Sequence, residues 1–153
     1  MTQCFLDSSA LIKRYVVEPG TPWIRSLTIR GSGNTIIIAQ ITQIEIVSGA
    51  SRRAREGTLP TRTVRAVRLL IDRHAQREYV VIGLTPQVVR RAEDLLPMYP
   101  LRAYDAVQLA SALESNTRLV AAGLSPLLFV SADVRLLTAA ATEGLMTEDP
   151  NAH

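Results

Sequence analysis

Apolar residues along this chain follow two patterns, short continuous runs and longer stretches with a helical period. Short runs lie at residues 4–6, 36–39, 80–82 and 127–130, and such runs are typical of strands that are buried on both faces of a sheet. Apolar positions recur with helical spacing over residues 9–16, 22–29, 40–56, 62–78, 86–96, 102–122 and 134–143. The pattern therefore predicts four strands and seven helices.

Strands and helices that alternate along a chain favour parallel pairing through right-handed crossovers. We therefore predict an α/β fold, a three-layer α/β/α sandwich around a central and mainly parallel sheet. Glycine and proline fall between the predicted elements, as in Glu18-Pro19-Gly20. The 153 residues suit one domain. We assign it to residues 1–147 and expect residues 148–153 to form a short frayed tail.

Composition limits the kinds of metal site and the cellular location. The single cysteine, Cys4, excludes an internal disulfide and a cysteine-based zinc cluster, and two histidines exclude a histidine-rich site. Any bound metal would need oxygen ligands. The first residues lack the basic and apolar segments of a signal peptide, and no apolar run reaches the ~20 residues of a membrane span. We therefore expect a cytoplasmic protein.

Charge is unevenly distributed along the chain. The net charge is only +3, but residues 52–91 contain ten arginines against three acidic residues, whereas the remainder is net negative. Arginine binds phosphate through a planar, two-pronged contact. On a regular helix over residues 62–78, Arg62, Arg65 and Arg68 lie on a different face from the apolar residues. They are candidate RNA-binding residues, although an ordinary solvated face is an equally simple explanation for any one of them.

Four acidic residues stand at positions that suit a shared site. Asp7 directly follows the first predicted strand. Asp133 lies two residues after Ser131, where the last predicted strand ends. Both should lie at the edge where parallel strands end and where α/β proteins bind ligands. Glu45 and Asp105 lie on apolar stripes of their predicted helices. We expect these two carboxylates to be buried, and buried carboxylates require a partner.

Each acid also has a purely structural explanation. Asp7 and Asp133 precede helices and could cap them, whereas Asp105 lies in a first turn that favours acids. Arg102 and Lys13 are available as ion-pair partners. Taken together, however, the four acids supply the hard oxygen ligands that Mg²⁺ and Mn²⁺ prefer. Such a cation lowers the pKa of a bound water and neutralises charge on a scissile phosphate.

Four blocks follow one another along the chain: LDSSALIKRY, ITQIEIVSGASRR, LRAYDAVQLASAL and FVSADVRLLTAAATEGL. In these blocks, and from residue 5 to residue 145, the sequence resembles the PIN-domain ribonucleases, and most closely the VapC-type toxins of bacterial toxin–antitoxin systems. The resemblance implies that Asp7, Glu45, Asp105 and Asp133 bind Mg²⁺ or Mn²⁺ and form the catalytic site. It also implies that Ser9 orients the first acid. Some family members carry a further acid where this chain has Arg135, which counts against a second tightly held metal.

The resemblance also implies an activity and partners. It predicts a metal-dependent endoribonuclease that cleaves structured RNA such as tRNA or rRNA, inhibits translation, forms a homodimer and is neutralised by a cognate antitoxin. Two alternatives remain. One is a non-catalytic RNA-binding or regulatory module on the same fold. The other is a phosphoryl-transfer protein, which is disfavoured because the chain has no Gly-rich phosphate loop and no second acid two residues after Asp7.

Overall fold

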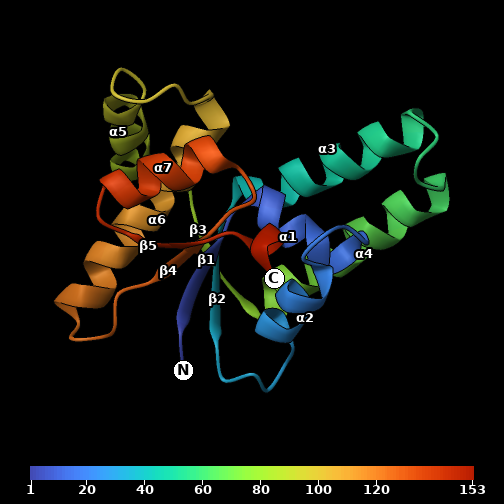
Figure 1. Cartoon of the computed structure of the whole chain (residues 1–153), viewed down its shortest axis with the longest axis horizontal. Helices are drawn as coiled ribbons and strands as arrows, with labels where there is room; N and C mark the ends of the chain where they lie inside the picture. The colour runs from blue at the N-terminus through green and yellow to red at the C-terminus, as the bar shows by residue number, and fades with distance from the viewer.

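A central sheet of five parallel strands lies between two layers of helices (Figure 1). The structure is a computed structural model that describes residues 1–153. The strands are β1 (Gln3–Leu6), β2 (Thr35–Ala39), β3 (Tyr79–Ile82), β4 (Leu128–Val130) and β5 (Met146–Glu148). Their order across the sheet is β3-β2-β1-β4-β5. The predicted fold class is therefore confirmed, with every pair of neighbouring strands parallel.

Seven α-helices connect and cover the strands, as the helical spacing predicted. They are α1 (Ser8–Tyr15), α2 (Thr21–Thr28), α3 (Ile41–Arg55), α4 (Thr61–Arg77), α5 (Pro86–Leu95), α6 (Ala103–Ala121) and α7 (Val134–Thr142). Helices α5, α6 and α7 lie on one side of the sheet and α1 to α4 on the other, and the α3–α4 hairpin projects away from the sheet at the right of Figure 1. No helix is both long and apolar enough to span a membrane.

Alternation of side chains along each strand divides the core into two halves. On β1, Phe5 packs in the cluster beneath α5, α6 and α7, whereas Cys4 and Leu6 pack in the cluster beneath α1 to α4. On β4, Phe129 packs in the cluster beneath α5, α6 and α7, and Val130 packs in the cluster beneath α1 to α4. Because both faces of the strands are covered by helices, the strands appear in the sequence as continuous apolar runs.

The end of the chain differs from the prediction. Residues 148–153 were expected to fray, but Glu148 belongs to β5, which pairs in parallel with β4. A short 3₁₀ helix, η1 (Pro150–Ala152), follows, and the ring of His153 stacks on Trp23 at 4.3 Å between centroids. The sequence Met146-Thr147-Glu148 contains no apolar run, so the pattern that revealed the other strands gave no signal here.

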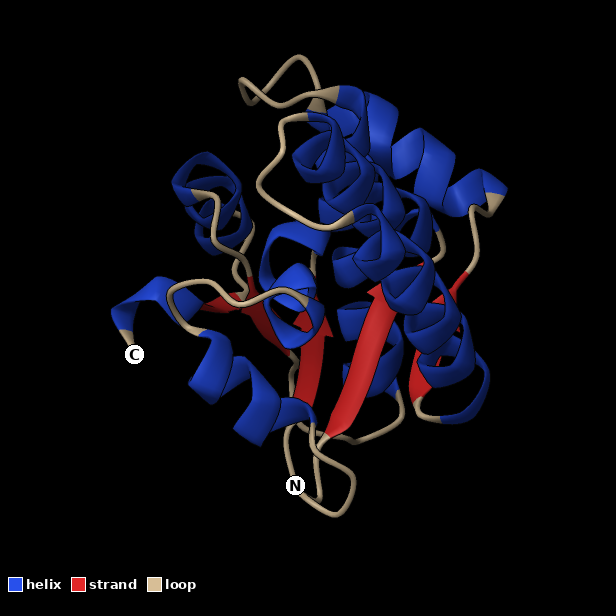
Figure 2. Cartoon of the chain, turned by 90° about the vertical axis from the view of Figure 1, so that its right-hand side faces the viewer, coloured by secondary structure: helices blue, strands red, loops and turns tan.

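The topology defines where a ligand would bind. From β1 the chain moves to β2 and β3 on one side, and it later returns to β4 and β5 on the other side. The strand order therefore reverses between β1 and β4, and such a reversal opens a crevice at the carboxyl ends of the strands. Every pair of neighbouring strands is parallel, as the arrows at the centre of Figure 2 show, so the residues that follow β1 and β4 meet at one edge.

Candidate active site

Asp7 is the buried acid at this edge. It follows β1, caps α1 and accepts a hydrogen bond from the backbone N–H of Ala10 at 2.9 Å. Only 3% of its surface is exposed, and the hydroxyls of Ser9 and Ser131 donate to its carboxylate at 2.8 and 2.9 Å. Burial, with a smaller contribution from the charge of Glu45, raises the pKa of Asp7 to about 7 despite these hydrogen bonds. A nearby cation would therefore strongly favour its ionised form.

Two serines fix the orientation of Asp7 by joining the loops after β1 and β4. Ser9 Oγ accepts a hydrogen bond from the backbone N–H of Ala132 at 2.9 Å, and Ser131 Oγ accepts one from the backbone N–H of Asp133 at 3.0 Å. Because the oxygen of each hydroxyl accepts a hydrogen bond from a backbone N–H, its O–H group is oriented to donate to Asp7. Sequence reasoning named Ser9 but missed Ser131, which could have been found from its position directly after a buried strand.

Glu45 on α3 is held by the buried Gln108 on α6, a helix that covers the other face of the sheet. Gln108 Nε2 donates to Glu45 Oε2 at 2.6 Å, and the same amide group is hydrogen-bonded to Thr42. Burial raises the pKa of Glu45, the hydrogen bonds from Gln108 and Ser8 lower it, and the charge of Asp105 raises it. Gln108 was also missed, although a long polar side chain one turn after Asp105, in the apolar first half of the helix, was a usable signal.

Asp105 lies in the first turn of α6, where its Oδ2 accepts a hydrogen bond from the backbone N–H of Arg102 at 3.2 Å. The expectation that Glu45 and Asp105 are buried is wrong in degree, because both are half-buried and Asp7 is the buried acid. The neighbours Ile44 and Tyr104 are 68% and 60% exposed. These ends of α3 and α6 therefore face solvent even though their apolar pattern suggested otherwise.

Asp133 caps α7 at the carboxyl end of β4. Its Oδ1 accepts hydrogen bonds from the backbone N–H groups of Arg135 and Leu136, and its Oδ2 lies 3.6 Å from the Arg135 guanidinium. The structural explanation of Asp7 and Asp133 as helix caps is thus confirmed. Capping occupies one face of each carboxylate and leaves further lone pairs for another ligand.

Of the four acids, Glu45 and Asp133 line one pocket, whereas Asp7 and Asp105 do not line it. The pocket has a volume of about 430 Å³, and its lining includes Ser8, Ser9, Glu45 and Asp133. The mutual effects on pKa link Asp7 to Glu45 and Glu45 to Asp105. No group of three His, Cys, Asp or Glu side chains is placed to hold a metal ion together. The structure therefore places Glu45 and Asp133 in one pocket and links Glu45 electrostatically to Asp7 and Asp105, but it does not bring the four acids together at one point.

The sequence of residues 4–125 matches the family model of the PIN domain. The chain belongs to the PIN-domain family. The match covers β1 to the end of α6 and includes Asp7, Glu45 and Asp105, whereas Asp133 lies beyond it. The predicted family resemblance is therefore confirmed.

Solved structures share this PIN-domain fold at low sequence identity. A chain of VapBC2 from Rickettsia felis, a structure that includes a DNA fragment from the VapBC2 promoter, aligns with a TM-score of 0.64. The identity is 14% over 97% of this chain and 98% of that chain. VapC20 from Mycobacterium tuberculosis, a sarcin-ricin-loop-cleaving toxin, gives 0.62 and 13% over 94% and 96%. A toxin–antitoxin complex from Klebsiella pneumoniae gives 0.61 and 17% over 96% and 97%. No curated protein sequence matches this chain.

Neither of the two cations suggested as partners, Lys13 and Arg102, forms a salt bridge with any of the four acids. Lys13 is buried, but its Nζ pairs with Glu18 at 3.0 Å and with none of the four acids. The Arg102 side chain lines the pocket and forms no salt bridge within the chain. Asp7, Glu45 and Asp105 consequently have no cationic side chain bound to them.

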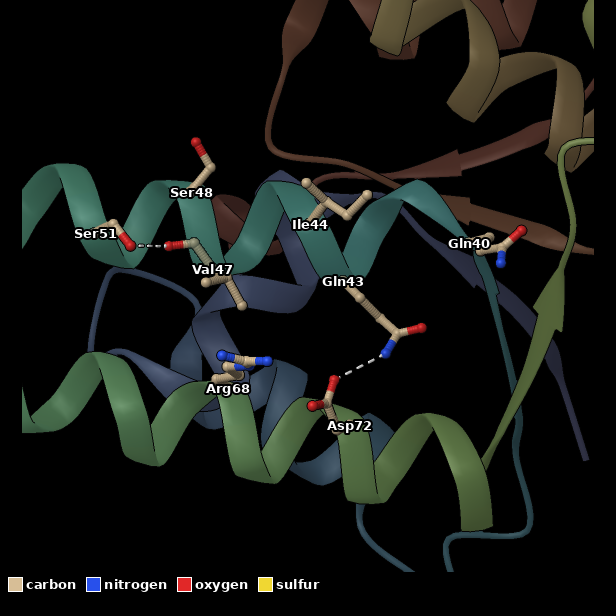
Figure 3. Close-up of a pocket in the computed structure, with 8 residues that line it drawn as sticks. All are labelled: Gln40, Gln43, Ile44, Val47, Ser48, Ser51, Arg68 and Asp72. Carbon is tan, nitrogen blue, oxygen red and sulfur yellow. Dashed lines mark hydrogen bonds between the residues drawn. The ribbon is translucent and has the colours of Figure 1, made fainter.

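The three arginines predicted to bind RNA lie on α4 and do not line the pocket that contains Glu45 and Asp133. Arg62, Arg65 and Arg68 are exposed, whereas Val67 and Ile71 on the same helix are buried, as the helical spacing predicted. Arg68 lines a separate hollow of about 570 Å³ between α3 and α4 (Figure 3). Within this hollow Gln43 donates a hydrogen bond to Asp72 at 3.1 Å. The larger hollow thus contains none of the four predicted acids.

Proposed function

We propose that this PIN-domain protein is a divalent-metal-dependent endoribonuclease, the toxin of a VapBC-type toxin–antitoxin pair, that cleaves structured RNA such as tRNA or rRNA. The observation that carries the proposal is the buried carboxylate of Asp7 at the strand-order reversal, electrostatically linked to Glu45 and without a cationic side chain. An RNA of this kind is found in the cytoplasm, where we expect the protein to act.

The donor set fits a hard divalent cation in its chemistry. Asp7, Glu45, Asp105 and Asp133 offer only carboxylate oxygens, which Mg²⁺ and Mn²⁺ prefer. Asp7 and Glu45 both have a raised pKa, and a cation would favour their charged forms. When bound, such a cation lowers the pKa of a coordinated water and offsets negative charge at the scissile phosphate.

The surrounding residues of this chain would serve by holding the carboxylates still. Ser9, Ser131 and the backbone N–H of Ala10 orient Asp7, and Gln108 orients Glu45. Partners of this kind keep ligating side chains in place and tune their basicity. In-line attack by water on the phosphodiester would leave a 5′-phosphate and a 3′-hydroxyl. Arg135 next to Asp133 supports a single firm metal site rather than two.

RNA contacts are proposed for the exposed arginines of α4. Arg62, Arg65 and Arg68 form part of the basic segment 52–91, and exposed arginines bind phosphates without reading sequence. Because these arginines do not line the pocket that contains Glu45 and Asp133, they would hold a part of the structured RNA away from the cleaved bond.

Two protein partners belong to the same proposal. Proteins with this fold occur in a toxin–antitoxin complex from Klebsiella pneumoniae and in VapBC2 from Rickettsia felis. We propose a cognate antitoxin for this chain, which inserts an arginine among the carboxylates, and a homodimer. A small copurifying protein that inhibits the nuclease would support the antitoxin, and failure of any partner to inhibit would contradict it.

Cleavage of purified tRNA and rRNA tests the activity. Wild-type protein should cut these RNAs with Mg²⁺ or Mn²⁺ and stop when EDTA is added. Asp7→Asn and Asp105→Asn should each reduce the rate by more than about 100-fold, the upper end of what loss of an outer-shell metal partner costs. Cleavage that survives EDTA, or that survives both substitutions, would contradict the proposal. RNA binding without any cleavage would favour the non-catalytic module.

A further inference from the structure

The pocket that contains Glu45 and Asp133 is also lined by cations. Lys13, Arg52 and Arg53 contribute to the same cavity of about 430 Å³, a volume within the roughly 300–1,000 Å³ range of small-ligand sites. None of the three belongs to the arginines of α4. A cavity that holds both carboxylates and cations suits a phosphodiester chain, which needs a metal at the bond to be cut and cations at the neighbouring phosphates.

Lys13 and Arg53 share a single carboxylate. Glu18 Oε2 accepts a hydrogen bond from Lys13 Nζ at 3.0 Å, and Glu18 Oε1 pairs with Arg53 Nη2. The Lys13 and Glu18 side chains are 5% and 14% exposed, whereas that of Arg53 is 32% exposed. Two cations on one anion leave a net positive charge, and that charge is accessible on the side of Arg53.

The backbone around Glu18 fixes the position of this ion triad. The Glu18 N–H donates to Thr21 Oγ1 at 2.9 Å, and the Glu18 carbonyl accepts from the Thr21 N–H at 3.1 Å. Gly20 has a left-handed conformation (φ +83°), and a Cβ there would lie 2.2 Å from the Pro150 carbonyl oxygen. The loop is therefore held against η1, and Glu18 can hold Arg53 in one place.

Arg52 adds a second accessible cation beside Arg53. It is exposed, it lines the pocket, and it forms no salt bridge. Through Glu18 the triad links Lys13 of α1 to Arg53 of α3. Two cations on this one carboxylate, with Arg52 unpaired next to Arg53, leave the pocket with an excess positive charge that could hold an anion.

We propose that Arg52 and Arg53 bind the RNA phosphate adjacent to the one cleaved at the carboxylates, and that Glu18, which the buried Lys13 holds in turn, is a positioning residue for Arg53. This inference rests on the proposed function, because it takes the ligand of the pocket to be RNA. The substrate must then extend at least one nucleotide beyond the cleaved bond. Arg53 acts by holding the chain and not by contacting the reacting atoms.

Binding of a short fluorescein-labelled single-stranded RNA in EDTA, followed by anisotropy at several salt concentrations, tests this subsite. Arg53→Ala should weaken binding about tenfold, equivalent to about 1.4 kcal/mol. It should also flatten the salt dependence by about 0.7, the slope for one phosphate contact on a single strand. Arg55→Ala is the matched control, since Arg55 lies on the same helix with the same charge but lines a different hollow. It should change affinity by less than about twofold.

Glu18→Gln separates positioning from net charge. The substitution makes the protein more basic, so charge alone would tighten RNA binding, whereas loss of the anchor for Arg53 should weaken it several-fold. Arg53→Ala keeps the buried Lys13–Glu18 pair, so it remains decisive if Glu18→Gln does not fold.

The outcomes separate this inference from the nuclease itself. Equal effects of Arg53→Ala and Arg55→Ala, tighter binding by Glu18→Gln, or no RNA binding by the wild type would each overturn the subsite. A loss of binding to a copurifying protein without loss of RNA binding would assign the triad to a protein interface and would also overturn it. If Arg53→Ala weakens binding but the wild type never cleaves RNA, the phosphate contact of Arg53 stands, whereas the nuclease and the place of that phosphate next to a cleaved bond fail.

Discussion

Asp7 has the most constrained environment of the four acids, because it is buried and its carboxylate accepts hydrogen bonds from three groups. Its donors are the hydroxyls of Ser9 and Ser131 and the backbone N–H of Ala10. Burial nevertheless raises its pKa to about 7, so in the absence of a cation the ionised carboxylate destabilises the fold. This is typical of a residue kept for function at a cost in stability.

Asp7→Asn should therefore stabilise the metal-free protein at pH 8. The unfolded pKa of aspartate is about 3.9, so between pH about 4 and about 7 the folded state binds more protons and stability falls as the pH rises. The gain from Asp7→Asn should be on the order of a few kcal/mol at pH 8 and should shrink towards pH 4. Urea unfolding in EDTA across this range measures it. A less stable variant at pH 8, or a gain that does not depend on pH, would contradict the assigned environment.

Ser131→Ala should raise the pKa of Asp7 above that of the wild type, because the Ser131 hydrogen bond is one of the interactions that lower it. The carboxyl carbon of Asp7, observed by NMR during a pH titration in EDTA, measures the shift. Ser115→Ala is a suitable control, since that buried hydroxyl donates to the Ser111 carbonyl of its own helix. An unchanged Asp7 titration in Ser131→Ala would show that the hydroxyl does not hold the carboxylate.

At the scale of elements, hydrophobic spacing predicted every helix and four of the five strands to within one or two residues. It succeeded where an element buries a regular set of side chains, as β1 does with Cys4, Phe5 and Leu6. It failed for β5, whose Met146 is 53% exposed, because backbone pairing with β4 rather than side-chain burial defines this strand. Contacts across the chain, such as Gln108 with Glu45, likewise leave little trace in local spacing.

Gly20→Ala should test whether η1 packs on the loop between α1 and α2 as described. The left-handed backbone costs about 1–2 kcal/mol for alanine, and the Cβ would clash with the Pro150 carbonyl oxygen. Gly57→Ala is the control, since Gly57 has a similar φ of +77° but no atom within 4 Å of the added Cβ. Thermal unfolding should show a clearly larger loss for Gly20→Ala. Equal losses would mean that η1 is not fixed there.

At the scale of the whole molecule, the fold brings together in one pocket opposite charges that lie far apart in the sequence. Residues 52–91 carry the basic excess, yet only Arg52 and Arg53 of that segment line the pocket with Glu45 and Asp133. Composition could indicate a polyanionic ligand but not which arginines would meet it. The family resemblance gave the acids by position, whereas their burial and partners depended on how α3 and α6 meet the sheet edge.

The central claim is that the carboxylates at this edge cut RNA. The most direct test maps the 5′ ends of cellular RNAs after brief expression of the wild type and of Asp7→Asn at matched protein levels. We predict new 5′-phosphorylated ends at a few sites in structured RNA with the wild type and none with Asp7→Asn. No new ends with the wild type, or the same ends with both proteins, would contradict the account.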